Sequence, residues 1–338
     1  MQEETSRQEA APTRQRFVVG EEEAGQRLDR YLAERLPGMS RTRVQELIEE
    51  GHVLVQGASG KPSQRVKAGM TVEVEVLPRP AHEARPEPIP LEILYEDEDV
   101  IVVNKPAGMT VHAGAGTTRG TLVNALMHRF GQLSTVSGPL RPGIVHRLDK
   151  TTSGVLIVAR NDAAHRQLAE QFRQRLVTKT YLALLHGRLK NDAGTILLPV
   201  ARDVRQRTRM TTRRREGREA RTDWRLLLRL DGFSLIEAEL RTGRTHQIRV
   251  HFSALGYPVV GDPLYGAPRQ ARAGSQILPP LGRNFLHAAR IRFQHPRHAV
   301  PVEVCAPLPA ELRAYLQRLA GALGADPSAI DAAAREYL

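Results

Sequence analysis

Residues 141–160 read RPGIVHRLDKTTSGVLIVAR, and this stretch joins a polar turn to an apolar run. The run that starts at Gly154 is rich in β-branched residues, which is typical of a buried strand. The Thr, Ser and Gly residues before it favour a tight loop that presents a side chain into a cleft. Asp149 opens that loop and is a candidate catalytic carboxylate. An aspartate that serves only the turn is the alternative that spacing alone leaves open.

Helical and strand patterns alternate unevenly on both sides of this stretch. They predict elements at 91–106, 120–130, 154–160, 162–175, 178–187, 233–243, 244–255 and 310–323. Leu168, Phe172 and Leu176 share one face of the helix predicted after residue 162. Strands separated by helical inserts of unequal length favour an α+β domain with a mixed, largely antiparallel sheet. We expect this domain to span residues 91–325 and residues 326–338 to form a C-terminal tail.

The N-terminal quarter predicts a second, smaller domain. Leu28, Tyr31 and Leu32 give one helical face, and Ser40 is a good N-cap for a helix that carries Val44 and its apolar neighbours. The sequence TVEVEV alternates strictly, as a half-buried strand should. The predicted organisation is a disordered tail at 1–16, a small domain at 17–77 and a stiff Pro-rich linker at 78–90.

The chain carries a formal net charge of +12 over 338 residues, with a pI of about 10.4. A surplus of this size suits a polyanionic partner such as RNA, although a solvated basic surface is the alternative. Residues 201–229 hold eleven arginines and four acids. Because Arg forks bind phosphate, we expect an RNA-contacting hairpin or loop here, with a solvated loop as the other interpretation. Its centre is formed by Arg213, Arg214 and Arg215.

The composition also argues against several classes of protein. Cys305 is the single cysteine, so the chain can form no internal disulfide and no cysteine metal site, and we expect Cys305 to be a small core residue. The sequence contains no apolar run long enough for a membrane helix and no apolar signal-peptide core. It also lacks a paired-carboxylate or HxxxH-type metal motif. We therefore expect a cytoplasmic protein that binds no metal.

The small domain resembles a known RNA-binding fold. The sequences SRTRVQELIEEGHVLVQG and KPSQRVKAGMTVEVEV resemble the alpha-L RNA-binding domain of a small-subunit ribosomal protein, over roughly residues 25–77. In that family the second helix and the next strand face RNA. The resemblance therefore implies RNA contacts for Ser40, Arg41, Arg43, Gln45, Lys61 and Lys67. Free backbone N–H groups in the first turn of that helix would also favour phosphate.

The large domain resembles the RluA/RluD family of pseudouridine synthases. GIVHRLDKTTSGVLIVAR is similar to its central motif, and the flanking matches are VNKPAGMTVHAGAG, GTLVNAL, TKTYLALLHG, LRTGRTHQIRVHFSALGYPVVGDPLYG and FLHAARIRFQHP. The resemblance implies isomerisation of uridine to pseudouridine in structured RNA. Together with the small domain it points to the large-subunit synthase D branch and to 23S ribosomal RNA. Thr151 and Ala113 depart from residues common in relatives, which bears on the RNA target and not on the reaction.

The resemblance also implies roles for individual residues. Asp149 would be the catalytic carboxylate, Arg249 its basic partner and Tyr181 the ring that stacks on the flipped base. Arg147 would enter the space that the base vacates. The residues expected to bind substrate beside them are His146, Arg244, Thr245, His246 and Gln247. The reaction needs no cofactor, and the sequence leaves both a covalent route and a glycal route open.

Two other functions compete with this interpretation. The first is a catalytically inactive relative that binds RNA during ribosome assembly, against which the presence of Asp149, Tyr181 and Arg249 argues. The second is a metal-dependent nuclease, which fits less well because no metal motif is present. The expected partner is large-subunit ribosomal RNA or a pre-ribosomal particle, and we expect the protein to act as a monomer.

Overall fold

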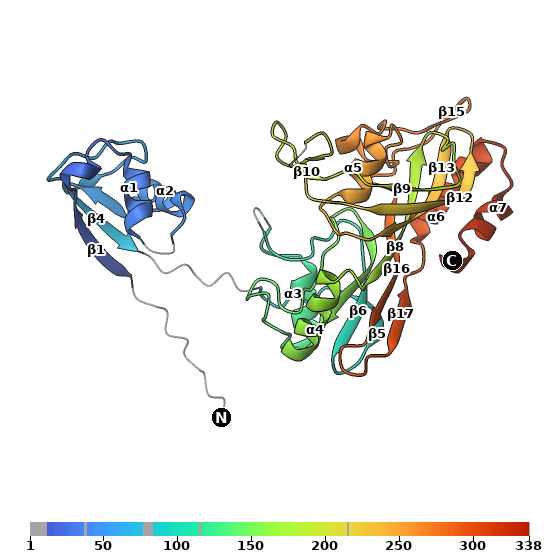
Figure 1. The fold of residues 1–338 in the computed structure, drawn as a ribbon, viewed down its shortest axis with the longest axis horizontal. Helices are drawn as coiled ribbons and strands as arrows, with labels where there is room; N and C mark the ends of the chain where they lie inside the picture. The colour runs from blue at the N-terminus through green and yellow to red at the C-terminus, as the bar shows by residue number, and fades with distance from the viewer. Residues whose placement is uncertain (1–11, 37–38, 77–83, 115–116, 215, 338) are drawn as a thin grey trace. The chain divides into compact units, whose positions relative to one another are not determined.

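The computed structural model describes residues 12–36, 39–76, 84–114, 117–214 and 216–337. The chain divides into two compact units, Met1–His82 and Glu83–Leu338 (Figure 1). The boundary falls inside residues 78–90, the predicted Pro-rich linker. Each unit has its own hydrophobic core.

The first unit is a four-stranded antiparallel sheet covered by two helices. The strand order is β1-β4-β2-β3, and the elements are β1 (Thr13–Val18), η1 (Glu21–Glu23), α1 (Leu28–Arg35), α2 (Arg41–Glu49), β2 (Val53–Val55), β3 (Ala58–Ser59) and β4 (Thr71–Val76). The Ser40 side chain accepts a hydrogen bond from the N–H of Arg43, so the predicted N-cap is confirmed. Leu28, Tyr31 and Leu32 are buried as the helical pattern predicts.

The expected N-terminal tail is shorter than residues 1–16. Residues 13–16 belong to β1, which pairs with β4. Ion pairs contribute to the pairing of β1 with β4, because Arg14 and Arg16 form cross-strand ion pairs with Glu75 and Glu73. Residues 1–11 lie outside the described part of the chain.

The second unit is built on a nine-stranded mixed sheet. Its order is β5-β6-β7-β16-β8-β13-β12-β9, and β17 also pairs with β16. Among the described residues β7 and β16 are parallel and every other neighbouring pair is antiparallel, as predicted. The strands are β5 (Glu92–Glu96), β6 (Val100–Lys105), β7 (Ser153–Ala159), β8 (Thr178–His186), β9 (Ala193–Ile196), β12 (Thr222–Leu230), β13 (Phe233–Leu240), β16 (Leu286–Gln294) and β17 (Pro301–Cys305).

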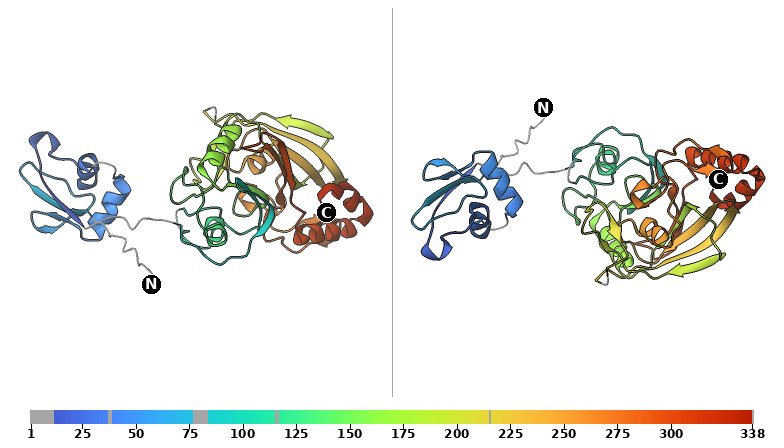
Figure 2. Two further views of the ribbon diagram at one scale, coloured as in Figure 1. Left: turned by 90° about the horizontal axis from the view of Figure 1, so that it is seen from below. Right: turned by 90° about the horizontal axis from the view of Figure 1, so that it is seen from above.

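Helices and two small hairpins complete this unit. The helices are α3 (Leu122–Phe130), α4 (Asp162–Arg173), α5 (Gln247–Ala254), η2 (Pro263–Tyr265), α6 (Ala310–Ala322), α7 (Pro327–Ala333) and η3 (Arg335–Tyr337). One hairpin joins β10 (Ala201–Arg202) to β11 (Met210–Thr211), and the other joins β14 (Arg272–Ala273) to β15 (Gln276–Ile277). The C-terminal helices α6 and α7 lie together at one end of the unit (Figure 2).

The second unit extends beyond residues 91–325 at both ends. Residues 326–338, expected as a tail, include α7 and η3, because Ile330 and Tyr337 are buried in the core and anchor these turns. On the other side, the N–H of Glu87 donates to the carbonyl of Asn124, so the last part of the Pro-rich segment lies along α3. The described residues of both segments therefore pack on the sheet domain.

Two side chains lie differently from the prediction. Leu176 follows the end of α4 and is exposed, because the helix ends at Arg173 and Arg175 adopts a positive φ. Cys305 is exposed rather than buried, because alternation along β17 turns Val304 inward and its neighbour outward. No helix among the residues that the structure describes is long and apolar enough to cross a membrane.

The loop that carries Asp149 enters the sheet at its centre. Gly154, early in β7, lies opposite both Lys105 of β6 and Ala288 of β16. Its φ is +114°, and an added Cβ would lie 2.1 Å from the carbonyl oxygen of Ala288. Only glycine permits this close approach, which brings the loop before β7 against β16.

Candidate active site

A cavity that is open to solvent lies where this loop meets β8 and the start of α5. The loop contributes residues 147–149 and Thr152, and β8 contributes Tyr181. Residues 243–248 form the opposite wall, and Leu240 and Leu286 complete the lining. Segments that are far apart in the sequence therefore supply the walls of one cavity.

Asp149 lines this cavity and is bonded to a buried guanidinium behind it. Nη1 of Arg249 donates to Oδ2 of Asp149 over 3.1 Å. The Asp149 side chain is 20% exposed and that of Arg249 is 8% exposed, so the carboxylate reaches solvent while its partner does not. The fixed cation orients the carboxylate through one oxygen, and the other oxygen remains open to a ligand.

A second carboxylate holds Arg249 from behind. Nε and Nη2 of Arg249 donate to the two oxygens of Asp262 over 2.6 and 2.9 Å, and the Asp262 side chain is 2% exposed. Burial by itself would lower the pKa of Arg249. The hydrogen bonds and charges of Asp262 and Asp149 outweigh that effect and raise the pKa. The guanidinium is therefore permanently charged and fixed in direction.

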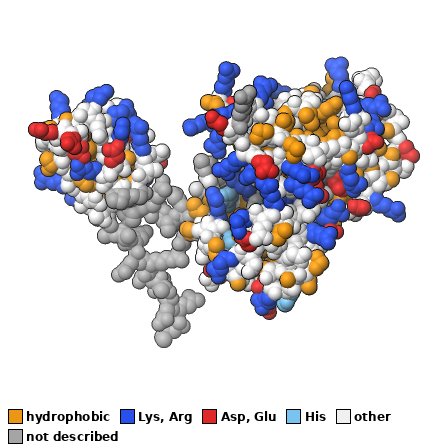
Figure 3. Space-filling model, in the orientation of Figure 1, with side chains coloured by type: hydrophobic (Ala, Val, Ile, Leu, Met, Phe, Trp, Pro, Cys, Tyr) orange, Lys and Arg blue, Asp and Glu red, His pale blue; other side chains and the backbone are white. Residues whose placement is uncertain are grey.

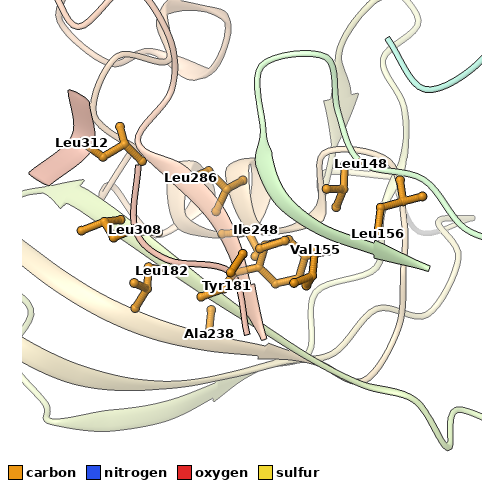
Figure 4. Packing of buried hydrophobic residues seen from close by; sticks show 14 of the residues in the cluster. Leu148, Val155, Leu156, Tyr181, Leu182, Ala238, Ile248, Leu286, Leu308 and Leu312 are labelled. Atoms are coloured by element: carbon orange, nitrogen blue, oxygen red, sulfur yellow. The ribbon is translucent and has the colours of Figure 1, made fainter. Parts of the chain in front are cut away.

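Tyr181 forms the apolar side of the cavity. It lies on β8 with 7% of its surface exposed, and Figure 4 shows its ring among Val155, Ile248 and Leu286. Burial and the charge of Asp149 both raise the pKa of its hydroxyl, so the phenol stays protonated. An aromatic ring in this place offers a flat surface for a nucleobase and a hydroxyl close to the carboxylate.

His246 is the third polar group near Asp149. Its Nε2 lies 3.8 Å from Oδ2 of Asp149, and its Nδ1 lies 2.9 Å from the hydroxyl of Tyr265. Burial lowers the pKa of His246, although the charge of Asp149 acts in the opposite sense. Its backbone is left-handed with φ +56°, a conformation that costs a non-glycine residue about 1–3 kcal/mol. The imidazole is therefore neutral near pH 7 and is held at the cavity by its surroundings.

The other residues expected to bind substrate divide into two groups. Arg147, Arg244 and Thr245 line the cavity, and Arg147 is exposed. Gln247 also borders it, but its amide is used internally, since it accepts from Thr242 and donates to the carbonyl of Arg221.

His146 points away from the cavity. Its Nε2 accepts the N–H of Ile157, and its ring stacks on Phe172 with centroids 4.7 Å apart. The structure therefore gives His146 the function of holding the Asp149 loop against β7.

Comparison with known proteins decides which family has this arrangement. Residues 99–254 match the family model described as RNA pseudouridylate synthase, and residues 26–72 match the S4 domain. A Chloroflexus aurantiacus protein named as an uncharacterised RNA pseudouridine synthase is 49% identical over 89% of this chain and 92% of its own. The chain belongs to the RNA pseudouridine synthase family.

Further relatives and one solved structure agree with this assignment. A Xanthomonas campestris protein named ribosomal large subunit pseudouridine synthase D is 43% identical, over 91% of this chain and 92% of its own. The solved structure of human RNA pseudouridylate synthase domain containing 1 has a TM-score of 0.51 and 32% identity, covering 70% of this chain and 96% of that one. The fold and the enzyme class predicted from the sequence are confirmed, and RNA is the substrate of this synthase.

A basic groove adjoins the active-site cavity of the synthase. It is lined by the β10–β11 hairpin and its surroundings, including Arg202, Arg214 and Arg218, and it shares residues 243–245 with the cavity. Arg213 is exposed, Arg214 pairs with Glu216, and Arg215 lies outside the described residues. Figure 3 shows Lys and Arg side chains gathered across the middle of the larger unit.

The S4 domain presents the other residues expected to contact RNA. Ser40 is used as a helix cap, and Lys61 and Lys67 are exposed. Arg43 pairs with Glu46 and Glu50 on its own helix.

Arg41 and Gln45 both contact a buried acid of the S4 domain. Arg41 is 52% exposed yet donates to the fully buried Asp29, which also accepts from Arg27 and Gln45. The pKa of Asp29 lies well below its usual range: burial opposes this shift, and the bonds from Arg27, Gln45 and Arg41 produce it.

Sequence reasoning missed the residues behind the candidate catalytic groups. Asp262 and Tyr265 lie in the quoted GDPLYG stretch, but nothing in its spacing connects them to Asp149. Lys105 was also missed. It is fully buried beneath the loop, where burial lowers its pKa to about 7, and its Nζ donates to the carbonyls of Pro106 and Met109.

One group of side chains in the synthase could hold a metal, although none was expected. Asp97, Asp99 and His295 bring three ligand atoms within 4.8 Å of one another. Both carboxylates already have partners, since Asp99 pairs with Arg297 and Asp97 bonds to His295. The group therefore links the β5–β6 turn to the loop after β16 through ion pairs and hydrogen bonds.

Proposed function

We propose that this synthase isomerises specific uridines of 23S large-subunit ribosomal RNA, with Asp149 as the catalytic carboxylate. The observation that supports this most is the position of Asp149, with one oxygen on the guanidinium of Arg249 and the Tyr181 ring beside it in one open cavity. The relatives named for the large ribosomal subunit support the RNA target.

The reaction conserves all atoms of the substrate. The bond between ribose C1′ and uracil N1 breaks, the base turns, and C1′ joins C5, which releases its proton while N1 gains one. No electrons are gained or lost, so the reaction calls for no redox cofactor. Asp149 would act on the ribose as a nucleophile or as a base, and Arg249 would stabilise its charge.

The uridine must leave its stack before Asp149 can reach the ribose. The proposal assigns Arg147, exposed at the mouth of the cavity, to the vacated space and Tyr181 to the extruded base. Arg244 and Thr245 border both the cavity and the basic groove, so the flanking phosphates would lie along Arg202, Arg214 and Arg218. The S4 domain would hold another part of the same RNA through Arg41 and its neighbours.

The test uses unmodified transcripts of 23S and small-subunit ribosomal RNA and of transfer RNA. Pseudouridine is mapped by chemical labelling and primer extension. We expect product only in the 23S transcript, no product with Asp149→Asn, and near-normal RNA binding by that variant. Asp231→Asn, an exposed aspartate in the β12–β13 turn, is the matched control. Wild-type protein that binds the 23S transcript and leaves every uridine unchanged would favour the inactive assembly factor instead.

Two further parts of the proposal concern the protein in the cell. We propose that it acts as a monomer in the cytoplasm, where pre-ribosomal particles assemble. Light scattering of the purified chain would give its mass, and cell fractionation would give its location. A stable dimer would contradict the first part.

A further inference from the structure

The hydroxyl of Tyr265 lies between the basic hairpin and His246. We propose that Tyr265 is a positioning residue: its hydroxyl fixes neutral His246 in the tautomer that presents an N–H at Nε2 to Asp149. This inference rests on the proposed role of Asp149. It assigns a function to Tyr265, which neither lines the cavity nor contacts the carboxylate.

The argument begins with the hydrogen bonds of one buried hydroxyl. Tyr265 is 1% exposed, and its oxygen accepts the backbone N–H of Met210 over 2.8 Å. The same oxygen lies 2.9 Å from Nδ1 of His246. Burial raises the pKa of Tyr265 to about 12, so its proton is present and needs an acceptor.

That proton has one acceptor among the hydrogen bonds of the described residues, which is Nδ1 of His246. If Nδ1 carried the imidazole proton instead, the hydroxyl would accept twice and its own proton would be buried without a partner. The arrangement that satisfies the buried hydroxyl has the tyrosine donating to Nδ1, and the proton of the neutral imidazole then lies on Nε2.

Nε2 is the nitrogen that faces the active site. It lies 3.8 Å from Oδ2 of Asp149, and the charged groups around the imidazole are Asp149, Arg249, Asp262 and Arg147. An N–H here attracts the carboxylate, whereas the other tautomer would turn a lone pair toward a negative charge. The Tyr265 hydroxyl thus decides between attraction and repulsion at Asp149.

The Tyr265 ring is itself held on several sides. The guanidinium of Arg249 lies 5.0 Å from its centre and that of Arg209 lies 5.4 Å away. The His246 ring meets it edge-on at 87°, and the left-handed backbone of His246 keeps that ring in place. The Tyr265 ring and the His246 imidazole therefore have little freedom to rotate, and the hydrogen bond between them is maintained.

The turn that carries Tyr265 also carries Asp262, which binds Arg249. Gly261 begins this turn with φ +75°, and a Cβ there would lie 2.0 Å from the carbonyl oxygen of Arg283. A single rigid turn thus orients both groups that face Asp149. Through Met210 it is also bonded to β11, the strand of the basic hairpin.

The first experiment measures the tautomer directly. Proton–nitrogen correlation spectra of histidine-labelled protein at pH 8 distinguish a neutral ring protonated at Nε2 from one protonated at Nδ1. We expect His246 to carry its proton on Nε2 in the wild type and to populate both forms in Tyr265→Phe. A wild-type His246 protonated at Nδ1 would overturn the proposal whatever the enzyme does.

The second experiment is a double-mutant cycle on single-turnover pseudouridine formation. In His246→Gln the amide nitrogen replaces Nε2 as donor and needs no tautomer. We expect Tyr265→Phe to slow the wild type roughly tenfold or more, and to change the His246→Gln enzyme by less than about twofold. The control is Tyr337→Phe, which removes another buried, hydrogen-bonded hydroxyl.

The outcomes separate this inference from the proposed function. Wild-type protein that forms no pseudouridine would contradict the proposed function. The tautomer measurement would still test whether Tyr265 fixes the proton of His246 on Nε2. An active wild type that Tyr265→Phe leaves unchanged would refute the positioning role. Equal losses in both backgrounds would also refute it, because Tyr265 would then act through general stability.

Discussion

Arg249 donates two hydrogen bonds to Asp262 and one to Asp149, so the buried acid, and not the exposed one, determines where the guanidinium points. The division has a chemical consequence. If Asp149 loses its charge during the reaction, Arg249 still has a carboxylate partner and stays in place. Asp149 can therefore react without leaving a buried cation unpaired.

Asp262→Asn should lower the single-turnover rate by roughly 10- to 100-fold and leave RNA affinity nearly unchanged. The amide removes the charge that aligns Arg249 and turns N–H groups toward the guanidinium. Rates and filter-binding affinities on the 23S transcript measure the two effects. Glu237→Gln is the control, because Glu237 also binds an arginine through both oxygens, the half-exposed Arg225, away from the cavity. A rate loss as large in the control would mean that any broken ion pair has this effect.

The stability of the second unit should fall in mild acid. His287 is fully buried, and burial lowers its pKa to about 4, whereas the unfolded value is about 6.5. Between these two pKa values the unfolded chain binds a proton at His287, whereas the folded chain does not. The free energy of unfolding should decrease as the pH falls from 6.5 toward 4, by up to about 1.4 kcal/mol per pH unit for this residue. His146 and His112 act in the same direction.

His287→Gln should make this dependence shallower by about one proton. Urea unfolding followed by the fluorescence of Trp224, the single tryptophan, reports on the second unit alone. The exposed His128, changed to Gln, should leave the slope as it is in the wild type. If the unfolding free energy depended on pH equally in His287→Gln and in the wild type, His287 would not be the source of this pH dependence.

Arg41→Gln should weaken RNA binding and reduce the salt dependence of the binding constant by about one phosphate contact. Arg41 is half exposed, and Asp29 holds its guanidinium in one direction, so it is ready to meet a phosphate. Titrations at several salt concentrations measure the slope. Arg16→Gln removes another exposed charge of the same domain, from the edge strand β1, where Glu73 is its partner, and should leave the slope almost unchanged.

Gly154→Ala should destabilise the second unit by at least about 3 kcal/mol, because a positive φ and a clash with the Ala288 carbonyl act together. Gly232→Ala provides the comparison: Gly232 has φ +71°, but an added Cβ would meet nothing within 4 Å. We expect a loss of about 1 kcal/mol there. Equal losses in urea unfolding would show that the close approach of β7 to β16 is not the important constraint.

Local patterns predicted most of the secondary structure. The alternation of TVEVEV, the cap at Ser40 and the helical spacing of Leu28 and Leu32 depend on neighbours within a few residues, and the structure has all three elements. The ends were less accurate. Residues 13–16 and 326–337 lack a strong local pattern, and they are ordered by partners far away in the chain.

For the site, the family motifs placed Asp149, Tyr181 and Arg249 together. In the structure Asp149 and Tyr181 line one cavity, and Arg249 donates to Asp149 from behind it. Motif order could not show which neighbouring residues turn inward. Gln247 borders the cavity with its amide already bonded, and His146 binds the backbone of β7, although both lie close in sequence to the candidate catalytic residues.

By itself, the sequence of this protein determined the family and the two-domain plan and singled out Asp149 as the candidate catalytic carboxylate, because short motifs and hydrophobic periodicity record these directly. Tertiary structure alone decided what surrounds that carboxylate. Asp262 and Tyr265 reach the site through a turn whose position depends on the packing of Gly261 against Arg283, and Met210 arrives from a separate hairpin. Hydrogen bonds between loops depend on distances in space, and those distances arise only when the whole sheet has formed.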